Sequence, residues 1–297
     1  MNNDNKIYII KASGDRELFD IKKLENSLKR AQANPKIIFD ILRTIQEELR
    51  DDMTTAEIYQ RAFELLKESE ITPAIKYSIR KAVTELGPQG FSFEDFIGAV
   101  LRAMGFKVRL RQIIKGLCVS HEIDILANNG EKFIIGEIKF HNKQGIKSDL
   151  KVVLYVVERL DDIEKGEFYR NIDKNLKKEK WLITNTKFTT SATEYAECSS
   201  KLNLISWNYP DNGNLHQLII EAGLYPLTIL KTLSSHDKKV FLENKIVLCR
   251  ELAEGGERLF NAVGVSPEKI EKTLAEIKVL LAMSGEGNLK DEAGLLR

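Results

Sequence analysis

The chain has 297 residues, of which 45 are lysine or arginine and 44 are aspartate or glutamate, so its formal net charge is only +1. This length predicts two or three domains, and the near-neutral charge excludes a strong global field for nucleic acid, although a local basic groove would be enough to bind it. Three cysteines, Cys118, Cys198 and Cys249, lack metal-binding spacing and cannot all pair, which is typical of buried thiols in a reducing compartment. Because no stretch is apolar enough for a signal peptide or a membrane span, we expect a cytoplasmic protein with no membrane partner.

The first 86 residues predict a separate unit, a set of helices with a small β-ribbon at its edge. Residues 7–20 read IYIIKASGDRELFD, which indicates two short strands around a Ser13-Gly14-Asp15 turn. Apolar residues then recur at helical spacing, with helices expected at about 21–33, 36–50, 55–68 and 72–86. We expect Asp20 to cap the first helix and Thr54 or Thr55 the third.

This unit resembles the ATP-cone, the nucleotide-sensing module of ribonucleotide reductases and their repressors. The family's Val-x-Lys-Arg-Asp-Gly and Phe-Asp-x-x-Lys-Ile correspond to Ile9-Ile10-Lys11-Ala12-Ser13-Gly14 and Phe19-Asp20-Ile21-Lys22-Lys23-Leu24. The resemblance implies that ATP or dATP binds as a regulatory ligand, with contacts from Lys11, Glu17, Lys23 and Thr55. Lysines and a helix N-terminus suit a triphosphate. Ala12 replaces the family's arginine, which removes a bidentate phosphate contact. A cone that serves only for docking or oligomerisation therefore stays an alternative.

An amphipathic helix is expected after the Leu86-Gly87-Pro88-Gln89-Gly90 break. Ser92 is its expected N-cap, Asp95 completes a capping box, and Gly105 ends it. Glu94 lies in the first turn, where a carboxylate suits the helix dipole.

Asp124 and Glu137 are expected to meet across a hairpin. The segment between them reads DILANNGEKFIIGE, with Asn129-Gly130 as the turn, and both flanks alternate between apolar and polar residues. Glu137 and Lys139 share a face of the second strand. Two carboxylates and an ammonium should therefore converge at the end of an apolar sheet.

Such a cluster needs a partner, because buried carboxylates are costly unless they are paired or bind a metal. A hard cation such as Mg²⁺ or Mn²⁺ would relieve the repulsion between the acids and would activate water on a phosphoryl group, with Lys139 assisting. The alternative is a salt bridge on a half-exposed hairpin.

The order helix with Glu, strand with Asp, strand with Glu-x-Lys and second helix resembles the PD-(D/E)xK superfamily of metal-dependent nucleases. Within it, the likeness is to the Mrr-like restriction endonucleases, over roughly Gly87 to Glu221. The resemblance implies that Asp124 and Glu137 bind the metal, that Lys139 is the catalytic lysine, and that Glu94 adds to the metal shell. Many Mrr-like enzymes have Gln in place of Glu137, so this chain carries the more general Glu-x-Lys form.

Candidate DNA contacts follow the Glu-x-Lys strand. Residues 148–163 predict a helix capped by Ser148, on which Lys151, Tyr155 and Arg159 form one polar stripe that either grips the phosphate backbone or is solvated. His121 and His141 are either DNA contacts or structural residues. The basic segment 164–180, which also carries aromatic residues, either lines a DNA groove or is solvated surface.

The rest of the chain completes a mixed sheet and adds helices. Strands at 181–189 and 203–210 with an intervening helix give an αβββαβαβ order. Thr184, Asn185 and Thr186 at a strand end either bind phosphate oxygens or satisfy the turn. From Gly223 onward the pattern is helical. Its Gly264-Val265-Ser266-Pro267 break resembles the joints of DNA-binding helix pairs, as any antiparallel helix pair can.

We therefore predict an α+β or α/β multidomain chain, with an ATP-cone at 1–86, a restriction-endonuclease-like domain at 87–222 and a helical domain at 223–297. The expected function is a Mg²⁺- or Mn²⁺-dependent DNA endonuclease that is regulated by ATP or dATP and forms a homo-oligomer. The alternative is a non-catalytic nucleotide-sensing regulator that binds DNA and keeps the nuclease fold as a scaffold. A nucleotide-hydrolysing role lacks a P-loop to support it.

Overall fold

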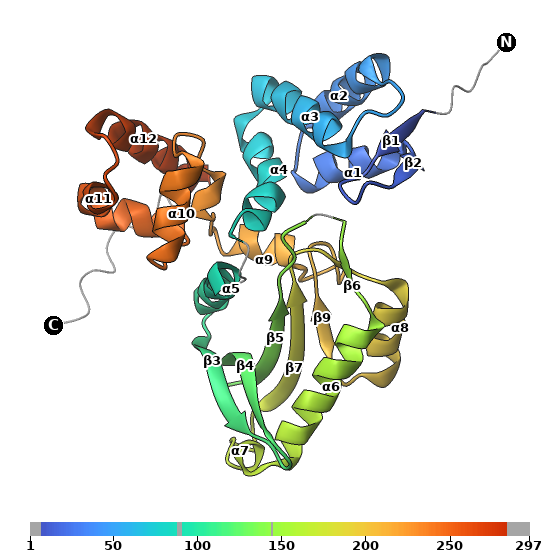
Figure 1. The fold of residues 1–297 in the computed structure, drawn as a ribbon. Helices are drawn as coiled ribbons and strands as arrows, with labels where there is room; N and C mark the ends of the chain where they lie inside the picture. The colour runs from blue at the N-terminus through green and yellow to red at the C-terminus, as the bar shows by residue number, and fades with distance from the viewer. Residues whose placement is uncertain (1–6, 88–90, 144, 284–297) are drawn as a thin grey trace. The chain divides into compact units, whose positions relative to one another are not determined.

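The computed structural model describes residues 7–87, 91–143 and 145–283. The chain is a multidomain α+β protein that divides into two compact units: residues 1–82 with 143–145, and residues 83–142 with 146–297 (Figure 1). None of the helices in the described ranges is both long enough and apolar enough to cross a membrane.

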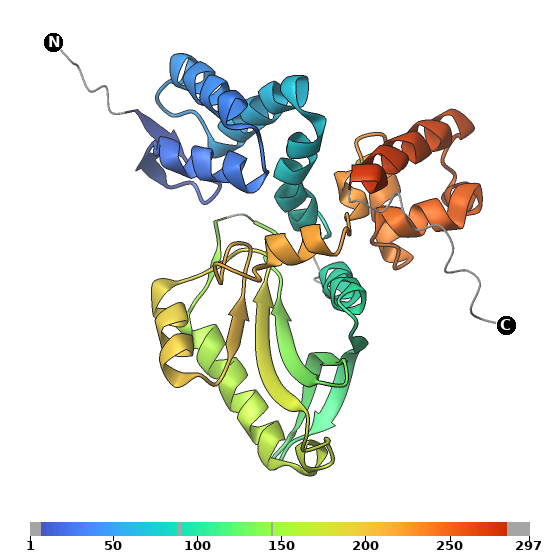
Figure 2. The same cartoon turned by 180° about the vertical axis from the view of Figure 1, so that it is seen from behind.

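The N-terminal unit is a two-stranded ribbon with four helices (Figure 2). Strands β1 (Tyr8–Ile10) and β2 (Arg16–Leu18) pair antiparallel around Gly14, whose φ of +89° suits a residue without a side chain. The helices are α1 (Ile21–Arg30), α2 (Pro35–Glu48), α3 (Thr55–Ser69) and α4 (Ile71–Thr84). Their apolar faces form one core of residues such as Leu28, Ile45 and Leu66, so the expected helical pattern is confirmed.

Side-chain caps set two of these helix starts. Asp20 accepts a hydrogen bond from the Lys22 amide at 3.0 Å, as expected. Of the two threonines considered for α3, Thr54 is the N-cap, since it exchanges hydrogen bonds with Glu57 in a capping box. Thr55 is the first helical residue.

The second unit is built on a five-stranded mixed sheet with strand order β3-β4-β5-β7-β9. Its strands are β3 (Lys107–Lys115), β4 (Ser120–Asn128), β5 (Lys132–Lys139), β7 (Lys177–Thr184) and β9 (Asn203–Ile205). The first three pair antiparallel, whereas β5, β7 and β9 pair parallel. Gly130, with a φ of +87°, closes the β4–β5 hairpin as expected.

Helices cover both faces of this sheet. On one face α6 (Leu150–Lys165) and α8 (Thr190–Ser199) pack on a core that includes Leu126, Ile135 and Leu182 (Figure 1). On the other face α5 (Phe91–Ala103) packs so closely that a Cβ on Gly98 would lie 3.0 Å from Leu110. The remaining elements are α7 (Glu167–Arg170), α9 (Leu215–Glu221) and a short parallel pair, β6 (Lys147–Ser148) with β8 (Lys187–Phe188). The order is therefore that of the expected mixed, helix-covered sheet.

Two expected helix caps are wrong. Helix α5 begins at Phe91, so Ser92 already has a helical position, and the Asp95 carboxylate instead accepts a hydrogen bond from Arg111 at 2.6 Å. Both partners of this bond are charged, whereas in the expected cap only the carboxylate would be. Helix α6 is capped by Asp149, which accepts from the Val152 amide, while Ser148 is buried in β6.

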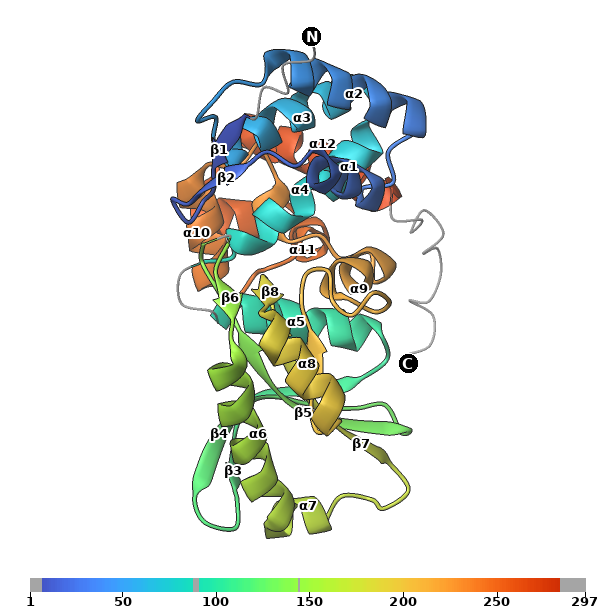
Figure 3. The ribbon, with the colours of Figure 1, turned by 90° about the vertical axis from the view of Figure 1, so that its right-hand side faces the viewer.

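The β3–β4 hairpin bends at Arg111. This residue has a φ of +54°, which is rare for a side chain of its size. The pairing of Leu110 with Ile125 and of Gln112 with Ile123 places Arg111 opposite Asp124, and that position is missing from the ladder. Beyond the bend, β3 and β4 lie beside α6 and α7 (Figure 3). The bend therefore falls at the strand position of the predicted acid.

The C-terminal part consists of η1 (Leu227–Ile229), α10 (Ser235–Glu243), α11 (Cys249–Val263) and α12 (Pro267–Met283). Helix α11 is interrupted at Gly256, whose φ of +53° and ψ of −157° are not helical, so two helical segments meet there at a kink. Gly264 does end α11, with a φ of +79°. The Glu276 carboxylate accepts hydrogen bonds from the amides of Lys231 and Thr232, which ties α12 to the segment after η1.

Candidate active site

Asp124 and Glu137 face each other where β4 leaves β5. The last ladder pair is Ile125 with Gly136, so the two acids occupy the next opposed positions. Instead of continuing the ladder, the Asp124 Oδ2 atom accepts a hydrogen bond from the Ile138 amide at 2.7 Å. The two carboxyl groups also hydrogen-bond to each other. A bond between two carboxyl groups requires a proton on one of them.

Burial and mutual repulsion keep that proton bound. Burial, followed by the charge of Asp124, raises the pKa of Glu137 to about 8, although Arg159 opposes the rise. Burial also raises the pKa of Asp124, against the bond from the Ile138 amide. Because the two titrations are coupled, the rise describes the pair rather than either residue alone. At neutral pH the pair therefore holds one proton.

Arg159 on α6 supplies the positive charge beside the pair. Its Nη1 atom lies 2.7 Å from Glu137 Oε1, and both side chains are largely covered, 17% and 13% exposed. The same guanidinium donates to the Glu122 carbonyl and lies over the Tyr155 ring. Glu137 Oε1 is nevertheless buried without a hydrogen bond within the described part of the chain. Its charged neighbour is the Arg159 guanidinium, at the ion-pair distance of 2.7 Å.

This donor set fits a magnesium ion. The residues that the structure describes contain no group of three histidine, cysteine or acidic side chains placed to hold a metal. Mg²⁺ does not need such a group, because it is commonly held by one or two carboxylates and completed by waters and substrate phosphates. The two hydrogen-bonded acids and the buried Glu137 Oε1 meet that requirement.

Glu94 lies close enough to Asp124 to interact with it electrostatically, but its carboxylate forms an ion pair with Arg111. Arg111 Nη1 donates to Glu94 at 2.9 Å, and Arg111 Nη2 donates to Asp95 at 2.6 Å. Burial raises the pKa of Glu94, and the nearby charge of Asp124 adds to the rise. The bend that places Arg111 opposite Asp124 therefore brings an arginine to the two acids of α5.

Lys139 is the exposed member of the predicted cluster. It follows Glu137 by two residues on β5, so the two side chains leave the same face of the strand. Within the part of the chain that the structure describes, no ion pair engages its ammonium. Its charge lowers the pKa of His141, after the larger effect of burial.

The predicted DNA contacts differ in their surroundings. His121 Nε2 lies 2.8 Å from Asp162, which also accepts hydrogen bonds from the Cys118 and Val119 amides. His141 Nε2 lies 3.0 Å from the Ser148 hydroxyl. Both histidines thus have protein partners, whereas Lys151 and Tyr155 are exposed on α6.

The Thr184-Asn185-Thr186 run is buried and serves the backbone. Asn185 accepts a hydrogen bond from the His141 amide and donates one to the His141 carbonyl, each at 2.8 Å. All three residues are at most 1% exposed. Of the two alternatives for this run, the structure supports the one in which it satisfies the turn.

In the N-terminal unit three of the four predicted nucleotide residues, Lys11, Glu17 and Lys23, form one ion-pair cluster. Glu17 lies 2.6 Å from the Lys11 ammonium and 3.2 Å from that of Lys23. The two lysines hold the pKa of Glu17 below its ordinary value, against the effect of burial. A triphosphate would compete with Glu17 for the two ammonium groups.

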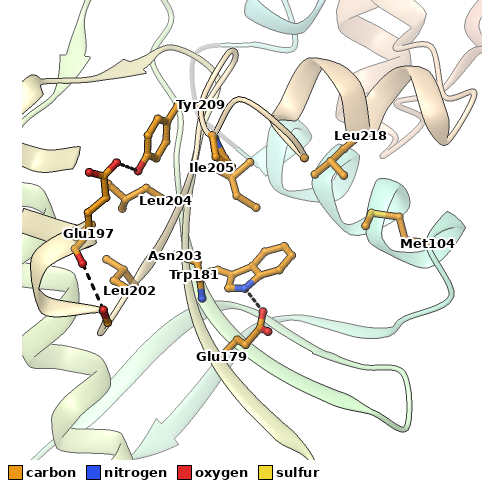
Figure 4. A pocket seen from close by; sticks show the side chains of 14 residues that line it. Met104, Glu179, Trp181, Glu197, Leu202, Asn203, Leu204, Ile205, Tyr209 and Leu218 are labelled. Atoms are coloured by element: carbon orange, nitrogen blue, oxygen red, sulfur yellow. Dashed lines mark hydrogen bonds between the residues drawn. The ribbon is translucent and has the colours of Figure 1, made fainter. Parts of the chain in front are cut away.

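A separate cavity of about 520 Å³ lies at the edge strand β9 (Figure 4). Trp181, Leu204 and Leu218 line it, and its polar groups are paired, with Tyr209 donating to Glu197 at 2.8 Å and Trp181 to Glu179 at 2.9 Å. None of the predicted site residues lines it.

The sequence did not predict that Arg111 pairs with Glu94. It predicted Arg159 as part of a polar stripe on the helix, but not as the partner of Glu137. The spacing of Lys151, Tyr155 and Arg159 on α6 could have suggested a charge facing the acids. No comparable signal exists for Arg111, because a positive φ at a strand arginine has no sequence signature.

Two family models match the two ends of the chain, and one known protein aligns with more than half of its length. Residues 7–84 match the ATP cone domain, and residues 225–281 match the family model AF1548-like, C-terminal. A protein from Archaeoglobus fulgidus, described as uncharacterized, is 34% identical over 186 residues, which are 61% of this chain and 98% of the relative.

Among solved structures, the crystal structure of a protein of unknown function, AF1548, superposes with a TM-score of 0.52 at 29% identity, over 64% of this chain and 97% of that one. The MspJI restriction endonuclease in complex with a 27-mer oligonucleotide reaches a TM-score of 0.26 at 12% identity, over 81% of this chain and 48% of that one. A likeness this low supports no conclusion about this chain.

The fold and these matches define a multidomain α+β protein with an ATP-cone at its N-terminus. The chain belongs to the same family as the uncharacterized Archaeoglobus fulgidus protein, and its C-terminal residues 225–281 match the AF1548-like, C-terminal model.

Proposed function

We propose that this chain is a Mg²⁺- or Mn²⁺-dependent nuclease that hydrolyses phosphodiester bonds in DNA and is regulated by ATP or dATP at its cone. The observation that carries the proposal is the hydrogen-bonded pair of Asp124 and Glu137, with a buried oxygen that lacks a donor and a lysine two residues further along the same strand. Paired acids followed by a lysine are the groups that metal-assisted phosphodiester hydrolysis uses.

The residues have distinct roles in this proposal. Asp124 and Glu137 would hold the cation, which when bound supplies a polarised phosphoryl oxygen and a water of lowered pKa. The acid pair must first release its shared proton, since only carboxylates are effective ligands. A cation on the two carboxylates would balance the charge of Glu137, so that the Arg159 guanidinium could contact a phosphate.

Lys139 is the residue proposed to act on the reacting atoms. Its ammonium is exposed and free of ion pairs among the described residues, so it can hold the attacking water or stabilise the negative charge on the phosphoryl oxygens. Glu94 is proposed as an additional acid only after Arg111 releases it, because its carboxylate is occupied here.

A digestion assay tests the proposal directly. The full chain is incubated with supercoiled and linear DNA, with Mg²⁺, with Mn²⁺ or with EDTA. Cleavage with either metal and none with EDTA is the expected result. Equal cleavage in EDTA would contradict the metal-dependent mechanism, and the absence of cleavage under all conditions would contradict the nuclease.

Nucleotide regulation gives a separate prediction. Lys11→Ala with Lys23→Ala should weaken ATP or dATP binding by at least about tenfold, because both ammonium groups that face Glu17 are lost. Isothermal titration of the full chain measures the affinity. Lys22→Ala, on a neighbouring exposed position, is the matched control and should bind as the wild type does. Equal affinity in all three proteins would place the nucleotide elsewhere or remove it from the proposal.

A non-catalytic regulator is the second candidate, and one observation favours it. Arg159 covers the acid pair, and neither of the two described cavities is lined by Asp124 or Glu137. Tight DNA binding that responds to nucleotide, without cleavage under any metal condition, would select this function over the nuclease.

A further inference from the structure

A basic hollow lies between the edge strand β3 and helix α7. Its volume is about 760 Å³, and its cations are Arg109 and Lys115 from β3 with Lys165 and Arg170 around α7. Glu167 is the one acid among the described residues that line it. The chain as a whole is almost neutral. The fold therefore gathers from two distant segments a positive charge that the overall composition does not show.

These four cations are not used to pair acids. Lys115 donates to the Cys118 carbonyl at 3.2 Å, and Arg170 donates to the Lys165 carbonyl at 3.3 Å, so both meet neutral acceptors. None of the four forms an ion pair within the ranges that the structure describes. A buried lysine of the same domain, Lys180, contrasts with them, because it pairs with both Asp161 and Glu164 at 2.5 Å.

The hollow borders β4, the strand that carries Asp124. Arg109 is opposite Leu126 in the β3–β4 register, and Leu126 also lines the hollow. Asp124 precedes Leu126 by two residues on β4, so the two residues lie about 7 Å apart along the strand. Beside the hollow, Ile113 is 80% exposed and Leu117 is 58% exposed.

We propose that this hollow binds the sugar-phosphate backbone of duplex DNA and directs one strand toward Asp124 and Glu137. The inference rests on the proposed nuclease function and names the surface that would hold its substrate. Exposed, unpaired arginine and lysine side chains bind phosphates by charge-assisted hydrogen bonds, and release of counterions adds to the affinity. The exposed Ile113 and Leu117 side chains lie where the apolar face of a deoxyribose can pack.

Duplex binding by the full chain tests this surface. Arg109→Gln with Arg170→Gln is introduced together with Asp124→Asn, which prevents cutting, and binding of a fluorescein-labelled duplex is followed by anisotropy in EDTA. Both arginines are exposed, so glutamine should not disturb the fold. At low salt we expect the affinity to fall about tenfold or more. The slope of log K against log salt should fall by about two, because two phosphate contacts are lost.

A control of equal charge separates this surface from a general electrostatic effect. Lys36→Gln with Lys67→Gln, on exposed positions of the N-terminal unit, removes the same two charges in the same Asp124→Asn background. Unchanged duplex binding in the control, with weakened binding in the arginine variant, supports the hollow. Equal losses in both, or none in the arginine variant, would overturn it.

Three further outcomes distinguish the surface from the proposed function and from other partners. If the arginine variant loses duplex binding while the wild-type chain cleaves no DNA, the surface stands and the nuclease fails. If the wild type cleaves and the arginine variant binds and cleaves equally well, the nuclease stands and the surface fails. If the variant loses affinity for vesicles containing phosphatidylserine but not for duplex, the hollow is a lipid surface and the proposal is wrong.

Discussion

Asp124→Asn is expected to lower DNA cleavage in Mg²⁺ by at least about a thousandfold. The change removes a charged metal ligand from a two-acid site and replaces it with a neutral amide of the same shape. The Asn side chain can still accept the Ile138 amide hydrogen bond at this position, so the hairpin should stay folded. Initial rates on a supercoiled plasmid, measured at equal protein concentration, give the ratio.

Two companion variants make this result specific. Lys139→Ala should lower the cleavage rate by at least about a hundredfold with little change in DNA affinity, because the ammonium is proposed to act in the transition state. Glu158→Gln, an exposed neighbour of Arg159 on α6, is the control and should cleave as the wild type does. Cleavage that persists in both Asp124→Asn and Lys139→Ala would assign the activity to another site or to a contaminant.

Glu137→Gln is expected to stabilise the metal-free protein at high pH and to have little effect at low pH. Burial and Asp124 raise the pKa of Glu137 from 4.5 to about 8, so the folded state holds this proton more tightly than the unfolded state does. The resulting stability is complete below about pH 4.5 and is lost as the pH rises through about 8. The loss is at most about 5 kcal/mol, and the coupling to Asp124 makes this an upper bound.

Unfolding in urea with EDTA, at pH 5 and at pH 9, measures this difference. Both tryptophans of the chain, Trp181 and Trp207, belong to this domain, so their fluorescence follows its unfolding. The glutamine variant should be the more stable protein at pH 9 by at least about 1 kcal/mol, which corresponds to a few degrees in Tm. Mg²⁺ should stabilise the wild type more than the variant. Parallel pH dependences in the two proteins, with Glu158→Gln as reference, would show that Glu137 is not the group that holds the proton.

The sequence predicted the elements of the candidate site better than their partners. Alternation around Asn129-Gly130 predicted the hairpin that carries both acids, because side chains alternate along each strand. Their direct opposition comes from the register in the structure, which pairs Asn128 with Phe133. A two-residue turn at Asn129-Gly130 would instead place Asp124 opposite Ile135. The predicted helix cap of α5 was wrong where a charged residue far away in the sequence binds the predicted capping side chain. The capping residues Ser92 and Asp95 were wrong because Arg111 takes the Asp95 carboxylate. Similarly, the predicted cap Ser148 was wrong: its hydroxyl lies 3.0 Å from His141 Nε2, and Asp149 caps the helix instead.

The sequence by itself determined the helical N-terminal unit, the order of helices and strands in the second unit, and the hairpin that carries the two acids. Each of these depends on residues close together in the chain, whose spacing repeats with the period of a helix or a strand. Only the tertiary structure decided that Arg159 pairs with Glu137, that Arg111 bends β3 toward Glu94, and that Arg109 and Arg170 line one hollow. These pairings join residues far apart in the chain, and they depend on how the helices pack on the sheet, which no local pattern contains.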